Sequence, residues 1–95
     1  MLCNVSLQVL PNVPEDKLYD TVDQVIELIK ASGVRFTVGP METTMEGELD
    51  ELLRIVKQAQ EVCCAAGAKR ICSVVKIDYS TEGVTMDEKV GKYQD

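Results

Sequence analysis

The chain contains no histidine and no tryptophan, and only 4% of its 95 residues are aromatic. Histidine is the commonest metal ligand and the side chain that most often acts as a general base near neutral pH, so its absence argues against a zinc site and against histidine-dependent catalysis. The glycines are scattered and form no GxxxxGK motif, which argues against a P-loop phosphate site. We therefore expect no metal, no cofactor and no enzyme activity.

Long apolar runs and basic clusters are also missing. No stretch of about 18 apolar residues occurs, so no segment is predicted to cross a membrane. Ten lysines and arginines stand against sixteen acidic residues, giving a net charge of −6. Proteins that bind nucleic acids or acidic membranes usually carry a basic patch. The sequence therefore predicts neither partner, while small cationic ligands remain compatible with its charge.

The four cysteines are Cys3, Cys63, Cys64 and Cys72, and they show no CxxC motif and no metal-binding spacing. Neighbouring residues on a helix point about 100° apart, which is poor geometry for a disulfide between Cys63 and Cys64. The opening residues have neither the basic start nor the apolar run of a signal peptide. We expect reduced thiols, packed mainly in the core of a cytoplasmic protein.

The pattern of apolar residues predicts one domain spanning residues 1–95. Alternation over residues 2–10 indicates a half-buried strand that ends at Pro11, and a helical period follows from Pro14 to Gly33. Further along the chain we expect strands over 34–38, 41–46 and 70–79, a helix over 48–66, and a short helix after Thr85. This βαββαβ order predicts an α+β, ferredoxin-like sandwich with a four-stranded antiparallel sheet and two helices on one face.

Each of the two long helices carries one apolar stripe that is predicted to face the sheet. In the first helix the stripe comprises Leu18, Val22, Val25, Ile26 and Ile29. In the second it comprises Leu49, Leu52, Leu53, Val56, Ala59 and Cys63. Burial of these stripes against the apolar strand faces would form the core.

The remaining face of the sheet, which we call the open face, is predicted to be polar. Alternation along the strands assigns to it Asn4, Ser6, Gln8, Arg35, Thr37, Glu42, Thr44, Glu46, Lys76 and Asp78, with Cys72 and Val74 as apolar members. It has no aromatic side chain on which RNA bases would stack. An ordinary solvated surface explains most of these positions, but the carboxylates of Glu42, Glu46 and Asp78 would repel one another, which favours a cationic partner.

The most informative segment runs from Val38 to Glu48, with the sequence VGPMETTMEGE. The Gly39-Pro40 pair predicts a turn, and a run of hydroxyls and carboxylates follows without any lysine or arginine in the segment. Such a patch suits a small, polar ligand that is cationic or carries an amine.

This segment resembles the signature of the small thiamine-binding protein family, and the similarity covers nearly the whole chain. The resemblance implies a ferredoxin-like fold whose copies pair through their sheets into homodimers or homotetramers, with thiamine or its hydroxymethylpyrimidine moiety near a sheet or subunit interface. The ligand-binding residues that we expect on this basis are Ser6, Gln8, Thr43, Thr44, Glu46 and Asp78. Glu46 would accept from the exocyclic amine, and the hydroxyls would meet the ring nitrogens. Glu42 departs from the family pattern, in which a small residue is common.

Two hypotheses of different classes follow. The first is a non-catalytic, cytosolic protein that binds thiamine or a pyrimidine precursor. The second is an oligomeric interaction protein whose polar sheet face pairs subunits without such a ligand. A regulatory domain that responds to another metabolite through the same face is a third, weaker hypothesis.

Overall fold

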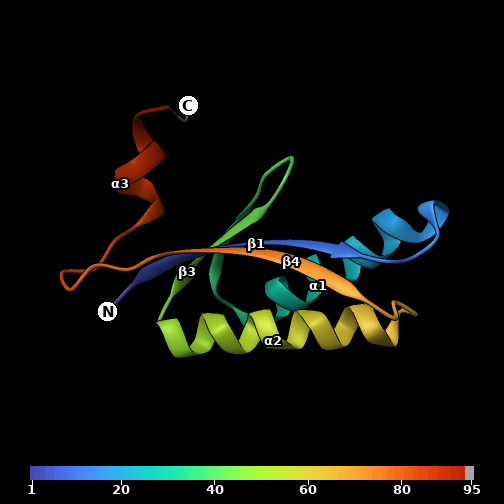
Figure 1. The fold of residues 1–95 in the computed structure, drawn as a ribbon. Coiled ribbons are helices and arrows are strands. Elements are labelled where there is room, and N and C mark those ends of the chain that lie inside the picture. The colour runs from blue at the N-terminus through green and yellow to red at the C-terminus, as the bar shows by residue number, and fades with distance from the viewer. Residues whose placement is uncertain (94–95) are drawn as a thin grey trace.

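The computed structural model of the protein describes residues 1–93 and confirms the ferredoxin-like arrangement (Figure 1). The elements in chain order are β1 (Cys3–Pro11), the 3-10 turn η1 (Glu15–Lys17), α1 (Leu18–Ser32), β2 (Arg35–Val38), β3 (Thr43–Gly47), α2 (Leu49–Ala65), β4 (Ile71–Asp78), α3 (Met86–Val90) and the 3-10 turn η2 (Gly91–Tyr93). The strands form one antiparallel sheet in the order β2-β3-β1-β4. Helices α1 and α2 lie on one side of the sheet, and α3 lies on the other.

The strand register confirms the assignment of the open face. Ser6 lies opposite Thr44 on β3 and opposite Lys76 on β4, while Asn4 lies opposite Glu46 and Asp78. Directly opposed residues in an antiparallel sheet project from the same face. These polar residues therefore share the face that α1 and α2 leave uncovered.

The core lies between the sheet and the two long helices. Its fully buried members on α2 are Leu52, Ile55, Ala59 and Cys63. The predicted stripe was wrong at one position, because Ile55 is 1% exposed whereas Leu53 is 39% exposed. Apolar residues cover a wide arc of this helix, so the rotation of the helix against the sheet decides which of them are buried.

The predicted core position of the cysteines is correct for two of the four. Cys3 and Cys63 are buried, and burial raises the pKa of both thiols. Cys64 and Cys72 are exposed, which corrects the expectation, and all four thiols are free. Cys64 follows Cys63 on the helix and so points away from the core, and Cys72 projects from the open face.

Two predicted helix ends are confirmed by the backbone. Gly33 ends α1 in the left-handed conformation with φ 81°, which glycine adopts without steric penalty. Thr85 precedes α3, and its hydroxyl oxygen accepts a 3.2 Å hydrogen bond from the Glu88 amide. None of the helices within residues 1–93 has both the length and the apolar character needed to cross a bilayer.

Candidate functional site

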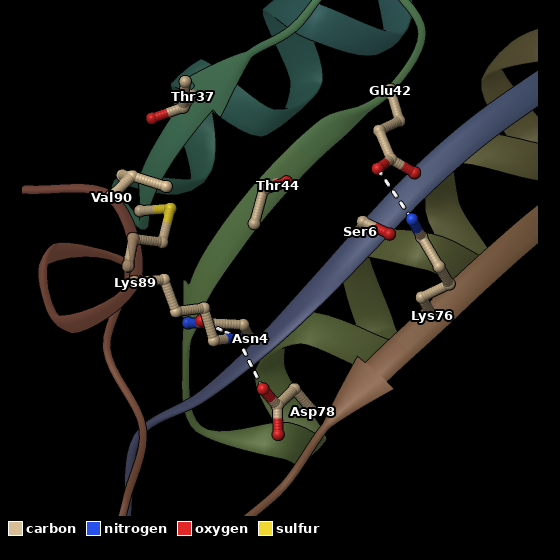
Figure 2. A pocket seen from close by; sticks show the side chains of 10 residues that line it. Asn4, Ser6, Thr37, Glu42, Thr44, Lys76, Asp78, Lys89 and Val90 are labelled. Carbon is tan, nitrogen blue, oxygen red and sulfur yellow. Dashed lines mark hydrogen bonds and ion pairs between the residues drawn. The ribbon is translucent and has the colours of Figure 1, made fainter. Parts of the chain in front are cut away.

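A cavity of about 450 Å³ lies on the open face, between the sheet and α3 (Figure 2). All four strands or their ends contribute to it, and α3 closes one side. Its lining residues are Asn4, Ser6, Thr37, Glu42, Thr44, Lys76, Asp78, Met86, Lys89 and Val90. This volume falls within the range of small-molecule sites, roughly 300–1,000 Å³.

The floor of the cavity contains two buried polar side chains from β1. Asn4 is 3% exposed and Ser6 is 7% exposed. Within the described residues, the Asn4 Nδ2 and Ser6 Oγ atoms have no hydrogen-bond partner. Leaving a buried polar group unpaired costs about 1–3 kcal/mol, so such groups are rare in native proteins. Two of them on one strand in a cavity make it a candidate site for a polar molecule.

The rim of the cavity is charged, but its carboxylates are paired with lysines. Lys76 Nζ donates to Glu42 Oε1 at 2.9 Å, and Lys89 Nζ lies 2.5 Å from Asp78 Oδ2. The hydrogen bond from Lys76 lowers the pKa of Glu42. The nearby Ser6 hydroxyl adds to this effect, although its contact with Glu42 does not reach hydrogen-bond geometry. The sequence segment around Glu42 has no basic residue of its own, but the fold supplies one, which corrects the expectation of an unneutralised acidic patch.

Glu46 anchors α3 to the sheet. It is only 8% exposed, and its Oε1 accepts a 2.7 Å hydrogen bond from the Met86 amide. Its Oε2 lies 3.7 Å from Arg35 Nη1, and Arg35 also donates two hydrogen bonds to Asp87 at 3.0 and 2.6 Å. This pairing lowers the pKa of Asp87. Two residues of neighbouring strands therefore hold the start of α3 over the open face.

The structure brings together some of the predicted site residues and separates others. Ser6, Thr44 and Asp78 line the cavity, and Glu46 lies beside it under the start of α3. Thr43 does not reach the cavity, because it pairs with Leu7 and projects toward the helices. Adjacent residues of a strand point to opposite faces, so Thr43 and Thr44 cannot serve one site.

Gln8 is the second predicted residue outside the cavity lining. It lies on the open face opposite Val74, further along β1 than Ser6. Like Thr43, it borders a separate groove of about 290 Å³ beside α1 and the β2–β3 turn. This groove is mostly apolar, which makes it a poorer match for a polar ligand than the cavity under α3.

Two residues that sequence reasoning did not select are central to the cavity. Asn4 could have been found, because it alternates with Ser6 and therefore shares its face. Lys89 carries no comparable signal, since nothing in the periodicity of a short C-terminal helix shows where it docks. No cluster of three or more potential metal ligands occurs within residues 1–93.

Replacing Lys76 with methionine is expected to raise the pKa of Glu42 toward its ordinary value, because the main cause of the lowered pKa is removed. A folded-state pKa below the unfolded value stabilises the fold above the unfolded pKa. This stabilisation is lost as the pH falls through the folded pKa. Carbon-detected NMR titration of the side-chain carboxyl groups measures the effect. Lys57→Met, on the exposed surface of α2, is the control, and an unchanged Glu42 pKa in Lys76→Met would contradict the pairing.

Comparison with known proteins gives consistent matches over the whole chain. The family model described as thiamine-binding protein matches residues 5–94. The UPF0045 protein of Clostridium perfringens is 64% identical over 92 residues, which cover 97% of each chain. A solved structure from Bacillus cereus, described as a domain of unknown function, DUF77, has a TM-score of 0.94 and 48% identity, covering 100% of this chain and 92% of its own.

A second solved structure comes from Thermotoga maritima and is described as a candidate thiamine biosynthesis or salvage protein. It has a TM-score of 0.92 and 37% identity, and the match covers 99% of this chain and 100% of the other. These matches agree with the resemblance carried by the Val38–Glu48 segment. The chain belongs to the thiamine-binding protein family.

Proposed function

We propose that this chain is a non-catalytic binding protein for thiamine or its hydroxymethylpyrimidine moiety, held in the cavity between the open face and α3. The observation that carries the proposal is the pair of buried, unpartnered polar atoms at the cavity floor, Asn4 Nδ2 and Ser6 Oγ. Family membership and the description of the Thermotoga maritima relative support the choice of ligand.

The chemistry of an aminopyrimidine matches this floor. Its ring nitrogens accept hydrogen bonds, and its exocyclic amine donates them. The Asn4 amide offers a donor, and the Ser6 and Thr44 hydroxyls on adjacent strands can donate or accept. On the rim, Asp78 offers carboxylate oxygens to the amine. Glu46, which we expected in that role, has one oxygen engaged by the Met86 amide and so contributes through the position of α3.

The charges of the cavity favour one orientation of thiamine. Glu42 and Asp78 on the rim are each paired with a lysine and the floor residues are uncharged, so the cavity is close to neutral and suits the uncharged pyrimidine ring. The thiazolium would lie toward the open side, where the net charge of −6 on the protein attracts a cation.

We further propose that copies of the chain associate through their open faces in the cytosol. Leu10 and Val74 are 47% and 44% exposed, and Cys72 lies opposite Leu10 on the same face. Exposed apolar groups on a sheet face favour association with another surface. Two exposed free thiols, Cys64 and Cys72, are in keeping with a reducing compartment. The same apolar patch favours the second candidate function, an oligomeric interaction protein without a thiamine ligand.

Isothermal titration with thiamine, thiamine phosphates and hydroxymethylpyrimidine tests the proposal, with light scattering to record the oligomer. In Ser6→Ala we expect about 10-fold weaker binding, because one hydrogen bond to the ligand is lost. The unliganded protein should be as stable as wild type or more stable, because a buried unpaired hydroxyl is removed.

Ser73→Ala is the matched control for this variant. Ser73 lies on the helix side of β4 and donates a 2.8 Å hydrogen bond to Gln60, so its loss should lower stability by about 1 kcal/mol and leave binding unchanged. An absence of heat with every ligand would refute the binding function. If Ser6→Ala then also dissociated the oligomer, the interaction function would be favoured.

A further inference from the structure

Lys89 on α3 reaches across the cavity edge to the floor residue Asn4 (Figure 2). Its Nζ donates to Asn4 Oδ1 at 2.8 Å and lies 2.5 Å from Asp78 Oδ2. Asn4 is nearly fully buried, and the other end of its amide, Nδ2, is the atom without a partner. One ammonium group therefore contacts both a rim carboxylate and the oxygen of the floor amide.

This contact determines which end of the Asn4 amide is available to a ligand. An ammonium group can only donate hydrogen bonds, whereas an amide can present either an oxygen acceptor or an NH₂ donor. If the amide were turned over, its NH₂ group would face the ammonium, and two donors would oppose each other in a partly buried place. The Asn4 oxygen must therefore face Lys89, which leaves Nδ2 as a donor on the ligand side.

We infer that Lys89 is a positioning residue that determines specificity. By holding the Asn4 oxygen, it makes Asn4 a fixed hydrogen-bond donor toward the ligand. The cavity then accepts a ligand edge that carries an acceptor and rejects one that carries a donor. The inference rests on the proposed function, because it supposes that the ligand occupies this cavity. It adds the prediction that an aminopyrimidine is preferred over an oxo-pyrimidine of the same size and shape.

The position of Lys89 is supported by contacts of two residues that precede it in α3. The Met86 amide is bound by Glu46, and Asp87 is bound by Arg35 through two hydrogen bonds. Asp78 holds the ammonium from β4. Because three strands fix the short helix, the ammonium is held at the Asn4 oxygen before any ligand arrives.

Thiamine and oxythiamine are the probes that test this inference. In oxythiamine an oxo group and a ring N–H replace the amino group and an acceptor ring nitrogen, so this edge has the opposite hydrogen-bonding polarity. Wild-type protein should bind thiamine at least about 10-fold more tightly than oxythiamine, because the oxo analogue leaves the Asn4 donor facing a donor. In Lys89→Met the amide is free to turn over, and the preference should fall to within about threefold.

Three further variants separate the hydrogen-bonding polarity at Asn4 from general effects of a substitution on folding or charge. Lys89→Arg should keep the preference, because a guanidinium is also only a donor. Asn4→Asp should reverse it, because a carboxylate presents an acceptor to the ligand. Lys92→Met is the control for charge in the same segment, since Lys92 lies over the Tyr93 ring at 5.0 Å, and it should leave both affinities unchanged.

The ratio of the two affinities is the decisive measurement. A merely structural role of Lys89 would weaken both ligands equally and leave the ratio intact, and that result would overturn the inference while the binding function stands. A failure of wild-type protein to bind either ligand would overturn the proposed function and the inference with it. Collapse of the ratio in Lys89→Met, together with its retention in Lys89→Arg, is the expected result.

Discussion

Replacing Asn4 with leucine is expected to weaken thiamine binding by more than about 100-fold while leaving the unliganded protein folded. Leucine is close to asparagine in size but has no hydrogen-bonding atom. The ligand would lose one hydrogen bond and keep an unpaired acceptor in a buried site, and each effect is of the order of 1–3 kcal/mol. The stability of the unliganded protein should change little, because removing the unpaired Nδ2 atom offsets the loss of the hydrogen bond from Lys89 to Oδ1, and Lys89 keeps its pairing with Asp78.

A large effect on binding beside a small effect on stability distinguishes a binding residue from a structural one. Isothermal titration measures the first, and urea unfolding without ligand measures the second. Asn12→Leu is the matched control, because Asn12 is exposed in the loop after β1 and lies outside the cavity lining. A large loss of stability in Asn4→Leu would show that Asn4 is a structural residue, and unchanged affinity would remove it from the site.

Replacing Ile55 with alanine is expected to destabilise the fold by about 2–5 kcal/mol, whereas Leu53→Ala should cost less than about 1 kcal/mol. Ile55 is 1% exposed and faces the sheet, so its truncation removes buried apolar surface and leaves a cavity. Leu53 is 39% exposed two residues earlier on the same helix. For a chain of this size, the larger effect corresponds to a fall in melting temperature of the order of 10 °C or more.

The pair tests how α2 is rotated against the sheet. Both substitutions remove a branched side chain from the same helix and change its intrinsic propensity by a similar, small amount. Their difference in the free energy of unfolding therefore reports burial alone. Equal effects, or a larger effect at Leu53, would mean that the helix presents a different face to the core.

The ferredoxin-like fold and the open face could be predicted because they depend on local patterns. Alternation along each strand assigns residues to faces, and the register of the sheet then places Ser6, Thr44 and Asp78 together. The same rule excludes Thr43, and its selection came from the family signature and not from its place in the strand. The same alternation assigns Asn4 to the open face, because it lies two residues before Ser6 on β1.

The position of α3 could not be predicted in this way. The Thr85 cap and the start of the helix are visible in the sequence, but five helical residues have too little periodicity to indicate a docking face. The contacts that place α3 join residues about 40 to 85 positions apart, as in the hydrogen bonds from Met86 to Glu46 and from Lys89 to Asn4. Such pairs leave no regular spacing along the chain.

The chain order of strands and helices, the polar character of one sheet face and the family could all be recognised in the sequence. The pairing of the acidic residues of this face with two lysines and an arginine, the cavity under α3 and the contact of Lys89 with Asn4 became visible only in the folded protein. This division arises because periodicity reflects which side of an element meets the core. Hydrogen bonds and ion pairs between distant segments depend instead on how the finished elements pack.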